Sequence, residues 1–165
     1  MKKCARSASI VSLAALAGVV AGCCRPRPLA PGEGPLQPPE LAFKGSEGAT
    51  TPEGRELVRY RIAVTNSMSF PAELFEVAPH LAPCGRNDRA SRTWVEILVT
   101  DRPGRPAKRR VYGFCALRAP RDLETLWFAA PKDAPLPCGV AVELQDRRLC
   151  RRYRSATLPL DCRRR

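Results

Sequence analysis

The sequence predicts an all-β protein, built as a single antiparallel β-sandwich of immunoglobulin-like type. From residue 57 to residue 160, short segments alternate apolar and polar side chains or are rich in β-branched residues, as half-buried strands are. The chain has 17 Pro and 11 Gly among its 165 residues, and many of them lie between these segments, where they favour turns. Six or seven short strands without a helical period are typical of a sandwich.

Each strand is predicted from its own pattern. In residues 57–65 and 139–145, apolar side chains occupy every second position, which places them on one face of a strand. Residues 94–100, 110–117 and 125–130 are rich in apolar and β-branched side chains. Residues 41–43 and 153–160 complete the set, and a short helical turn is expected near residues 121–126.

The first 22 residues have the features of an export signal. Lys2, Lys3 and Arg6 form a basic start, and residues 10–21 are apolar or small except for Ser12. An apolar run this short does not span a bilayer as a mature helix, which needs about 20 residues. A basic start followed by a short apolar run and small residues predicts a secretory signal peptide.

The signal ends in Val20-Ala21-Gly22-Cys23, which resembles the signal of bacterial lipoproteins. The resemblance implies lipidation of the Cys23 sulfur, cleavage after Gly22 and acylation of the new amino group. The lipid would anchor the chain to a membrane, because several acyl chains give stable anchoring without a spanning helix. An ordinary signal peptide with a chance cysteine and an uncleaved anchor remain as alternatives.

The residues after the signal refine the expected location. Cys24 offers a second, poorer cleavage site, and Arg25 stands where inner-membrane lipoproteins carry Asp. The resemblance therefore implies a lipid-anchored protein of the cell envelope, at the outer membrane if the cell is Gram-negative. Residues 23–40 contain six Pro and are expected to be a disordered, semi-rigid linker. The predicted β-domain with a basic C-terminal tail is then 41–165.

The chain is strongly basic, with 28 Lys and Arg against 16 Asp and Glu. Removal of residues 1–22 takes away three basic side chains and lowers the formal net charge from +12 to +9. An exported basic domain can attract an acidic envelope polymer, such as lipopolysaccharide, or an envelope protein. A merely solvated basic surface is the alternative. The anion-binding candidates are Arg147, Arg148, Arg151, Arg152 and Arg154. Nucleic acid is not an expected partner, because the basic run has few interleaved aromatic residues and the signal predicts export.

The cysteines predict disulfides. Of eight, Cys4 is expected to leave with the signal and Cys23 to be lipidated, so six would remain in a compartment that permits disulfides. Matching the apolar faces of residues 139–145 and 153–160 pairs Val142 with Leu158 and Val140 with Leu160. The same register brings Cys138 opposite Cys162, and a tighter turn at residues 146–149 is the alternative with the poorer apolar match.

With Cys138 and Cys162 paired, the sequence offers predictions for the other cysteines. Cys84 and Cys115 are the natural second pair, between a Pro-rich loop and a strand. Cys150 is left with three alternatives, which are a free thiol, a bond to Cys24 and a bond between two molecules.

The sequence carries no signal of catalysis. It has no phosphate-binding loop, no nucleophile motif and no motif that clusters carboxylates, so we expect a non-catalytic protein without a cofactor or metal. The alternative function is a small-ligand or copper-type metal-binding domain using His80, Cys84 and Met68. Trp94 and Trp127 are expected in the core, and glycan binding by an exposed Trp is the alternative.

Several short pieces of the chain show a second resemblance. They are RYRIAVTNS, FPAELF, APCGRN, ASRTWVEI, YGFCAL, LWFA and VELQDRR. These pieces are similar to a group of uncharacterised exported bacterial proteins that carry one such domain, and they cover roughly residues 57–160. The resemblance implies the β-sandwich fold and its boundaries, and it implies no particular chemistry.

Overall fold

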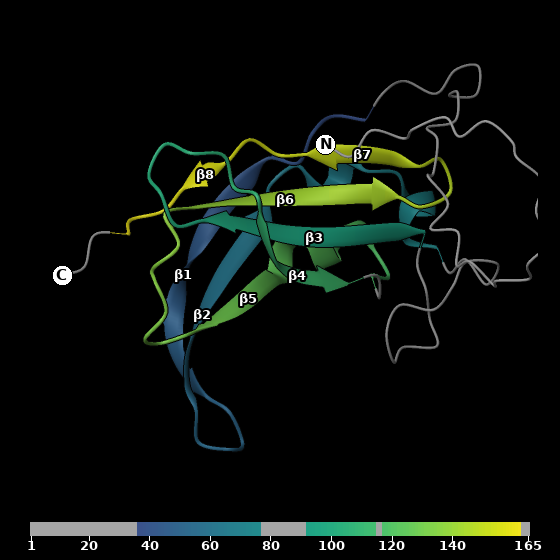
Figure 1. Ribbon diagram of the computed structural model, residues 1–165. Coiled ribbons are helices and arrows are strands. Elements are labelled where there is room, and N and C mark those ends of the chain that lie inside the picture. Colours follow the sequence, from purple (N-terminus) through teal and green to yellow (C-terminus); the bar gives the residue numbers. More distant parts are fainter. Residues whose placement is uncertain (1–35, 77–91, 115–116, 163–165) are drawn as a thin grey trace, which may run out of the picture.

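The computed structural model describes residues 36–76, 92–114 and 117–162, and these residues form two antiparallel sheets (Figure 1). The three-stranded sheet has the order β1-β2-β5, and the five-stranded sheet has the order β4-β3-β6-β7 with β8 also paired to β6. The strands are β1 (Leu41–Thr50), β2 (Glu56–Val64), β3 (Thr93–Thr100), β4 (Arg109–Phe114), β5 (Leu126–Pro131), β6 (Gly139–Asp146), β7 (Arg151–Arg154) and β8 (Leu158–Pro159). The all-β sandwich predicted from the sequence is confirmed. Its assignment to the immunoglobulin-like type stays a prediction.

Three short 3-10 helices connect the strands. They are η1 (Ser67–Ser69), η2 (Ala72–Phe75) and η3 (Pro120–Thr125). The last confirms the helical turn expected near residues 121–126, and Asp122 starts it by accepting hydrogen bonds from the backbone N–H groups of Arg118 and Ala119. Within the part of the chain that the structure describes, no helix is long and apolar enough to cross a membrane.

The core lies between the two sheets and follows the alternation seen in the sequence. Ile62 and Val64 of β2 lie in one buried cluster with Ile97 and Val99 of β3. The ring of Tyr60 stacks on that of Phe128, with centroids 4.8 Å apart. The burial raises the pKa of the Tyr60 hydroxyl, because desolvation disfavours the charged form.

The first strand is much longer than the predicted segment 41–43. β1 continues to Thr50 and pairs with β2 along its whole length, with a bulge between Phe43 and Gly45. Gly45 has φ 108°, a conformation that glycine adopts without strain. The later residues of β1 are Gly, Ser, Glu, Ala and Thr, most of which have a low strand propensity. Pairing with β2, rather than propensity, therefore fixes this strand.

The predicted register of the last hairpin is wrong. Val140 pairs with Leu158 and Leu144 pairs with Tyr153, so neither the expected register nor the tighter alternative occurs. The segment predicted as one strand is split at Ser155, whose hydroxyl accepts a hydrogen bond from the backbone N–H of Val142 at 3.0 Å. A side chain thus takes the place of a backbone acceptor, and the register shifts by one residue between β7 and β8.

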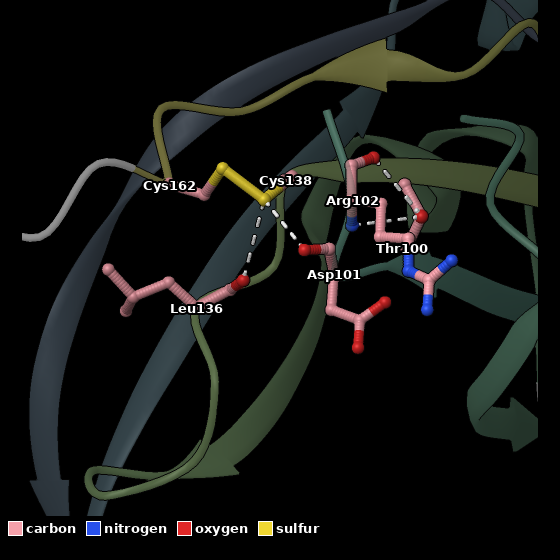
Figure 2. The surroundings of a disulfide bond; sticks show 6 residues. All are labelled: Thr100, Asp101, Arg102, Leu136, Cys138 and Cys162. Atoms are coloured by element: carbon pink, nitrogen blue, oxygen red, sulfur yellow. Dashed lines mark hydrogen bonds between the residues drawn. A yellow bond between two sulfur atoms is a disulfide. The ribbon is translucent and has the colours of Figure 1, made fainter. Parts of the chain in front are cut away.

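The predicted Cys138–Cys162 disulfide is present nonetheless (Figure 2), with the two Cα atoms 4.7 Å apart. The backbone N–H of Leu160 bonds to the carbonyl of Cys138 at 3.0 Å, and the chain then turns so that Cys162 reaches Cys138. The Cys138 sulfur lies 3.1 Å from the carbonyl oxygen of Asp101. The bridge closes the end of the five-stranded sheet where β3 ends and β6 begins.

Cys150 is also disulfide-bonded, which removes the free thiol from its three alternatives. Its partner lies outside the described residues, because Cys138 and Cys162 bond to each other. Cys23, Cys24, Cys84 and Cys115 lie outside the described residues too, so the lipidation site and the Cys84–Cys115 pair stay predictions.

Candidate functional site: two charged outer faces

The five predicted anion-binding arginines do not share one surface. Arg152 and Arg154 are exposed on the outer side of β7, whereas Arg151 and Tyr153 alternate with them and are half-buried. Arg147 and Arg148 lie in the turn between β6 and β7. Strand alternation therefore places the predicted anion-binding arginines of β7 on two different faces, since neighbouring side chains of a strand point to opposite faces.

The turn itself is held by a buried carboxylate. Asp146 is 2% exposed, and the Arg92 guanidinium donates to its two oxygens at 2.9 and 2.5 Å. The backbone N–H groups of Arg148 and Leu149 bond to the same carboxylate at 2.9 and 3.1 Å. Four donors on one buried anion offset its desolvation, so the Asp146 carboxylate and the Arg92 guanidinium are structural rather than free to bind a ligand.

A cavity of about 450 Å³ lies beside this turn. Its lining combines Arg148 with Glu73 and Glu76 of the η2 region and with Tyr153. Burial raises the pKa of the Tyr153 hydroxyl, and burial lowers the pKa of the neighbouring Arg147. Because acidic and basic side chains are mixed there, the cavity is not a simple anion site.

A row of charged side chains crosses the outer face of the five-stranded sheet. Glu96 of β3 is directly opposite Glu143 of β6, a position where two like charges are destabilising. Arg110 of β4 pairs with Glu96 at 3.0 Å, and Arg152 of β7 pairs with Glu143 at 3.2 Å. The order Arg110–Glu96–Glu143–Arg152 follows the strand order β4-β3-β6-β7, so each carboxylate is neutralised from its own side.

The connection from β3 to β4 adds further basic residues to this face. Segment 102–110 carries five basic side chains and no acidic one, and it crosses the sheet (Figure 1). Ala107 in this segment is buried against Leu98 and Ala141. Its carbonyl accepts a hydrogen bond from the Arg154 side chain, and its N–H donates to the Thr157 hydroxyl at 3.0 Å.

These contacts join two basic runs that are more than forty residues apart in the sequence. We use the name basic face for the exposed residues that meet here, which are Lys108, Arg110, Arg152 and Arg154. The arginines of β7 were predicted from the sequence, whereas Lys108 and Arg110 were not among the candidates. The run Lys108-Arg109-Arg110 was a visible signal of charge patterning, but the sequence did not show that it lies beside β7.

The two tryptophans are not core residues, contrary to the prediction. Trp94 is half-buried on the outer side of β3, where its ring covers Gly113 and its Nε1–H donates to Glu96 at 3.1 Å. Trp127 is 42% exposed on the outer side of β5. The reason is position in the sheet, since alternate residues of each strand point outward and the inner positions are taken by their neighbours.

The residues of the alternative metal site are not brought together by the described structure. His80 and Cys84 lie outside the described residues, and Met68 is exposed at 67%. The described residues contain no group of three His, Cys, Asp or Glu side chains placed to hold a metal ion.

Comparison of the chain with models of protein families, with curated proteins and with solved structures finds no match.

Proposed function

We propose that this protein is a lipid-anchored lipoprotein of the cell envelope whose β-sandwich is a non-catalytic module that binds an acidic envelope polymer. The anchor is inferred from the basic start, the short apolar run and Val20-Ala21-Gly22-Cys23. The partner class is inferred from charge. With residues 1–22 removed, the chain keeps a formal net charge of +9, and a basic surface attracts polyanions such as phosphate-rich lipopolysaccharide.

The observation that carries the partner class is the basic face. Two separate basic segments converge there through the bond from Arg154 to Ala107. The two glutamates of this face, Glu96 and Glu143, are each neutralised by an arginine within it. Lys108 and Arg154 therefore contribute an excess of positive charge, as an electrostatic binding surface requires.

The course of the N-terminal segment supports an orientation toward the membrane. Residues 37–41 line a groove of about 670 Å³ together with Arg154 and residues 156–159. Leu36 lines the neighbouring cavity with Arg148. The linker thus enters the domain beside β7, and the 13 peptide units between Cys23 and Leu36 span at most about 45 Å. This arrangement keeps the basic face within reach of acidic material at the membrane surface.

The anchor is tested by the intact mass of the protein purified from its native membrane and alkylated without reduction. We expect acyl mass on a chain that starts at Cys23, and no alkylation of the disulfide-bonded Cys138, Cys150 and Cys162. A chain that carries no lipid contradicts the anchor and makes the protein a released one.

The partner class is tested by retention on immobilised lipopolysaccharide at increasing salt. The variant Lys108→Gln/Arg110→Gln/Arg152→Gln removes three charges from the basic face. We expect each to contribute roughly 1 kcal/mol at low salt, so retention should fall strongly. The matched control is Arg55→Gln/Arg118→Gln/Arg121→Gln, which removes three exposed charges from the β1–β2 turn and the η3 region. Equal losses in the two variants would show that net charge alone, and not this face, sets retention.

A further inference from the structure

The outer face of the three-stranded sheet carries a second cluster, which the basic face does not include. Four large apolar side chains are exposed in the described residues, and two of them, Tyr112 and Trp127, touch each other. Their rings stack with centroids 5.8 Å apart and an interplanar angle of 28°. The Arg59 guanidinium lies over the Trp127 ring, 4.8 Å from its centroid. Neither aromatic residue lines the groove at residues 37–41 or the cavity beside the β6–β7 turn.

The topology explains why these rings meet. Trp127 is opposite Arg61 in the β2–β5 pairing, so it shares the outer face with the arginines of β2. β5 is an edge strand of the three-stranded sheet, and β4, which carries Tyr112, is an edge strand of the five-stranded sheet. The two edges adjoin (Figure 1), and the rings form one strip across them. We call Arg59, Arg61, Tyr112 and Trp127 the aromatic face.

The arginines of the aromatic face are incompletely paired. Arg61 binds both oxygens of Glu47, at 2.7 and 2.8 Å. Arg59 reaches one of the same oxygens only at 3.5 Å, which is long for a hydrogen bond. The buried Nε of Arg59 has no hydrogen-bond partner among the described residues. Two guanidinium groups thus share one carboxylate, and the face has a surplus of positive charge beside the exposed rings.

We infer that the aromatic face is a binding site for an acidic polysaccharide, whose sugar rings carry carboxylates. The C–H face of a pyranose ring is apolar and flat, so it packs on the exposed parts of Trp127 and Tyr112. A carboxylate on that ring then lies where Arg59 and Arg61 can donate to it, and Arg is suited to planar, bidentate recognition of carboxylates. The apolar face of the sugar and its carboxylate are thus each matched by side chains of the aromatic face.

The combination of rings and charge favours this partner over the other candidates. A polyphosphate or a lipid headgroup would use the arginines and leave the two rings without a role. A neutral glycan would use the rings and leave the guanidinium surplus without one. The inference rests on the proposed function in one respect, which is that the domain is exported to a compartment where acidic polysaccharides occur.

The test measures binding of the full-length lipidated protein, in detergent, to three probes by calorimetry. An oligogalacturonate carries a carboxylate on every sugar ring, a neutral oligogalactan of equal length carries none, and polyphosphate carries charge without rings. We expect the oligogalacturonate to bind at least about tenfold more tightly than the galactan, since a charge-assisted contact to Arg61 is lost with the latter.

The decisive variant is Trp127→Ala. We expect it to weaken oligogalacturonate binding about tenfold, as truncation of an aromatic residue central to a binding site does, and to leave polyphosphate binding unchanged. Trp127→Phe should keep most of the affinity because it keeps a ring. Phe43→Ala is the matched control, since Phe43 is 43% exposed against 42% for Trp127 and lies outside the aromatic face. It should change neither affinity.

The outcomes separate this inference from the proposed function. If Trp127→Ala binds the oligogalacturonate as the wild type does, or if the wild type does not bind it, the aromatic face is not a glycan site. If polyphosphate binding is absent or survives neutralisation of the basic face, the proposed polymer-binding role of that face fails instead. If Trp127→Ala does not fold, Arg61→Gln tests the inference instead. This variant should lose the preference for the oligogalacturonate over the neutral galactan, and a preference that is kept would contradict the glycan site.

Discussion

The two outer faces of the sandwich use the same kinds of residue in different ways. On the outer face of the five-stranded sheet, Trp94 donates to Glu96 and covers Gly113, and Glu96 and Glu143 each have their own arginine. On the aromatic face, Trp127 is exposed and two arginines share Glu47. We therefore expect the contacts of Trp94 to stabilise its own sheet. We expect the exposed ring of Trp127 and the surplus charge of Arg59 and Arg61 to be accessible to a ligand.

The strongest test of this contrast compares truncation of the two tryptophans. Trp94→Ala removes a half-buried ring and its bond to Glu96, and we expect it to lower the free energy of unfolding by about 2–3 kcal/mol. Trp127→Ala removes a more exposed ring and two surface contacts, and we expect a loss of about 1 kcal/mol. Urea denaturation of both variants measures the two values. A larger loss for Trp127 would make that residue primarily structural and would weaken the contrast.

Gly113→Ala sharpens the same contrast from the other side of the Trp94 ring. A Cβ added at Gly113 would lie 2.8 Å from Cζ2 of Trp94, so the indole must shift. We expect a destabilisation of about 1–2 kcal/mol, as for other overpacked positions. The double variant Gly113→Ala/Trp94→Phe should recover part of this loss, and thermal unfolding measures both. If the single variant is as stable as the wild type, the ring is not confined by its neighbours.

Much of this fold could be predicted because the core follows strand alternation. The inner positions of β2 and β6 were visible as apolar residues at every second position, and β3 was visible as an apolar, β-branched run. The extent of β1 was missed because its residues have low strand propensity and form a strand through pairing with β2. The hairpin register was missed because Ser155 replaces a backbone acceptor with its hydroxyl, which apolar matching does not reveal.

The candidate sites were harder to predict than the fold. The arginines of β7 were found as a run in the sequence, but the Lys108 segment joins them only through the packing of Ala107 on Leu98 and Ala141. The contact between Trp127 and Tyr112 depends on β5 being an edge strand that adjoins β4. Strand order is a tertiary property, and a single strand's pattern contains no information about it.

A second pair of variants tests the salt bridges of the two faces. Arg152 and Arg61 are similarly exposed, but their carboxylate partners differ, with the Glu143 side chain 11% exposed and that of Glu47 42% exposed. Arg152→Ala leaves a nearly buried carboxylate opposite Glu96, and we expect a loss of about 1–2 kcal/mol. Arg61→Ala leaves Glu47 accessible to water and beside Arg59, and we expect about 0.5 kcal/mol or less. Equal losses in urea denaturation would contradict the proposed difference between the faces.

The smallest expected effect on stability belongs to Glu47→Gln, and it is the most informative about binding. Glu47 is the carboxylate that Arg59 and Arg61 share, so the amide removes the competing anion while keeping the size of the side chain. Because exposed ion pairs contribute little, the free energy of unfolding should change by less than about 0.5 kcal/mol. Oligogalacturonate binding should become tighter and more salt-dependent, since both guanidinium groups are then available to the ligand. The matched control is Glu56→Gln, which breaks a comparably exposed pair with Lys132 outside both faces. If Glu47→Gln weakens binding instead, Glu47 holds the two arginines in the geometry that the ligand needs, and the surplus charge is not what recruits the ligand.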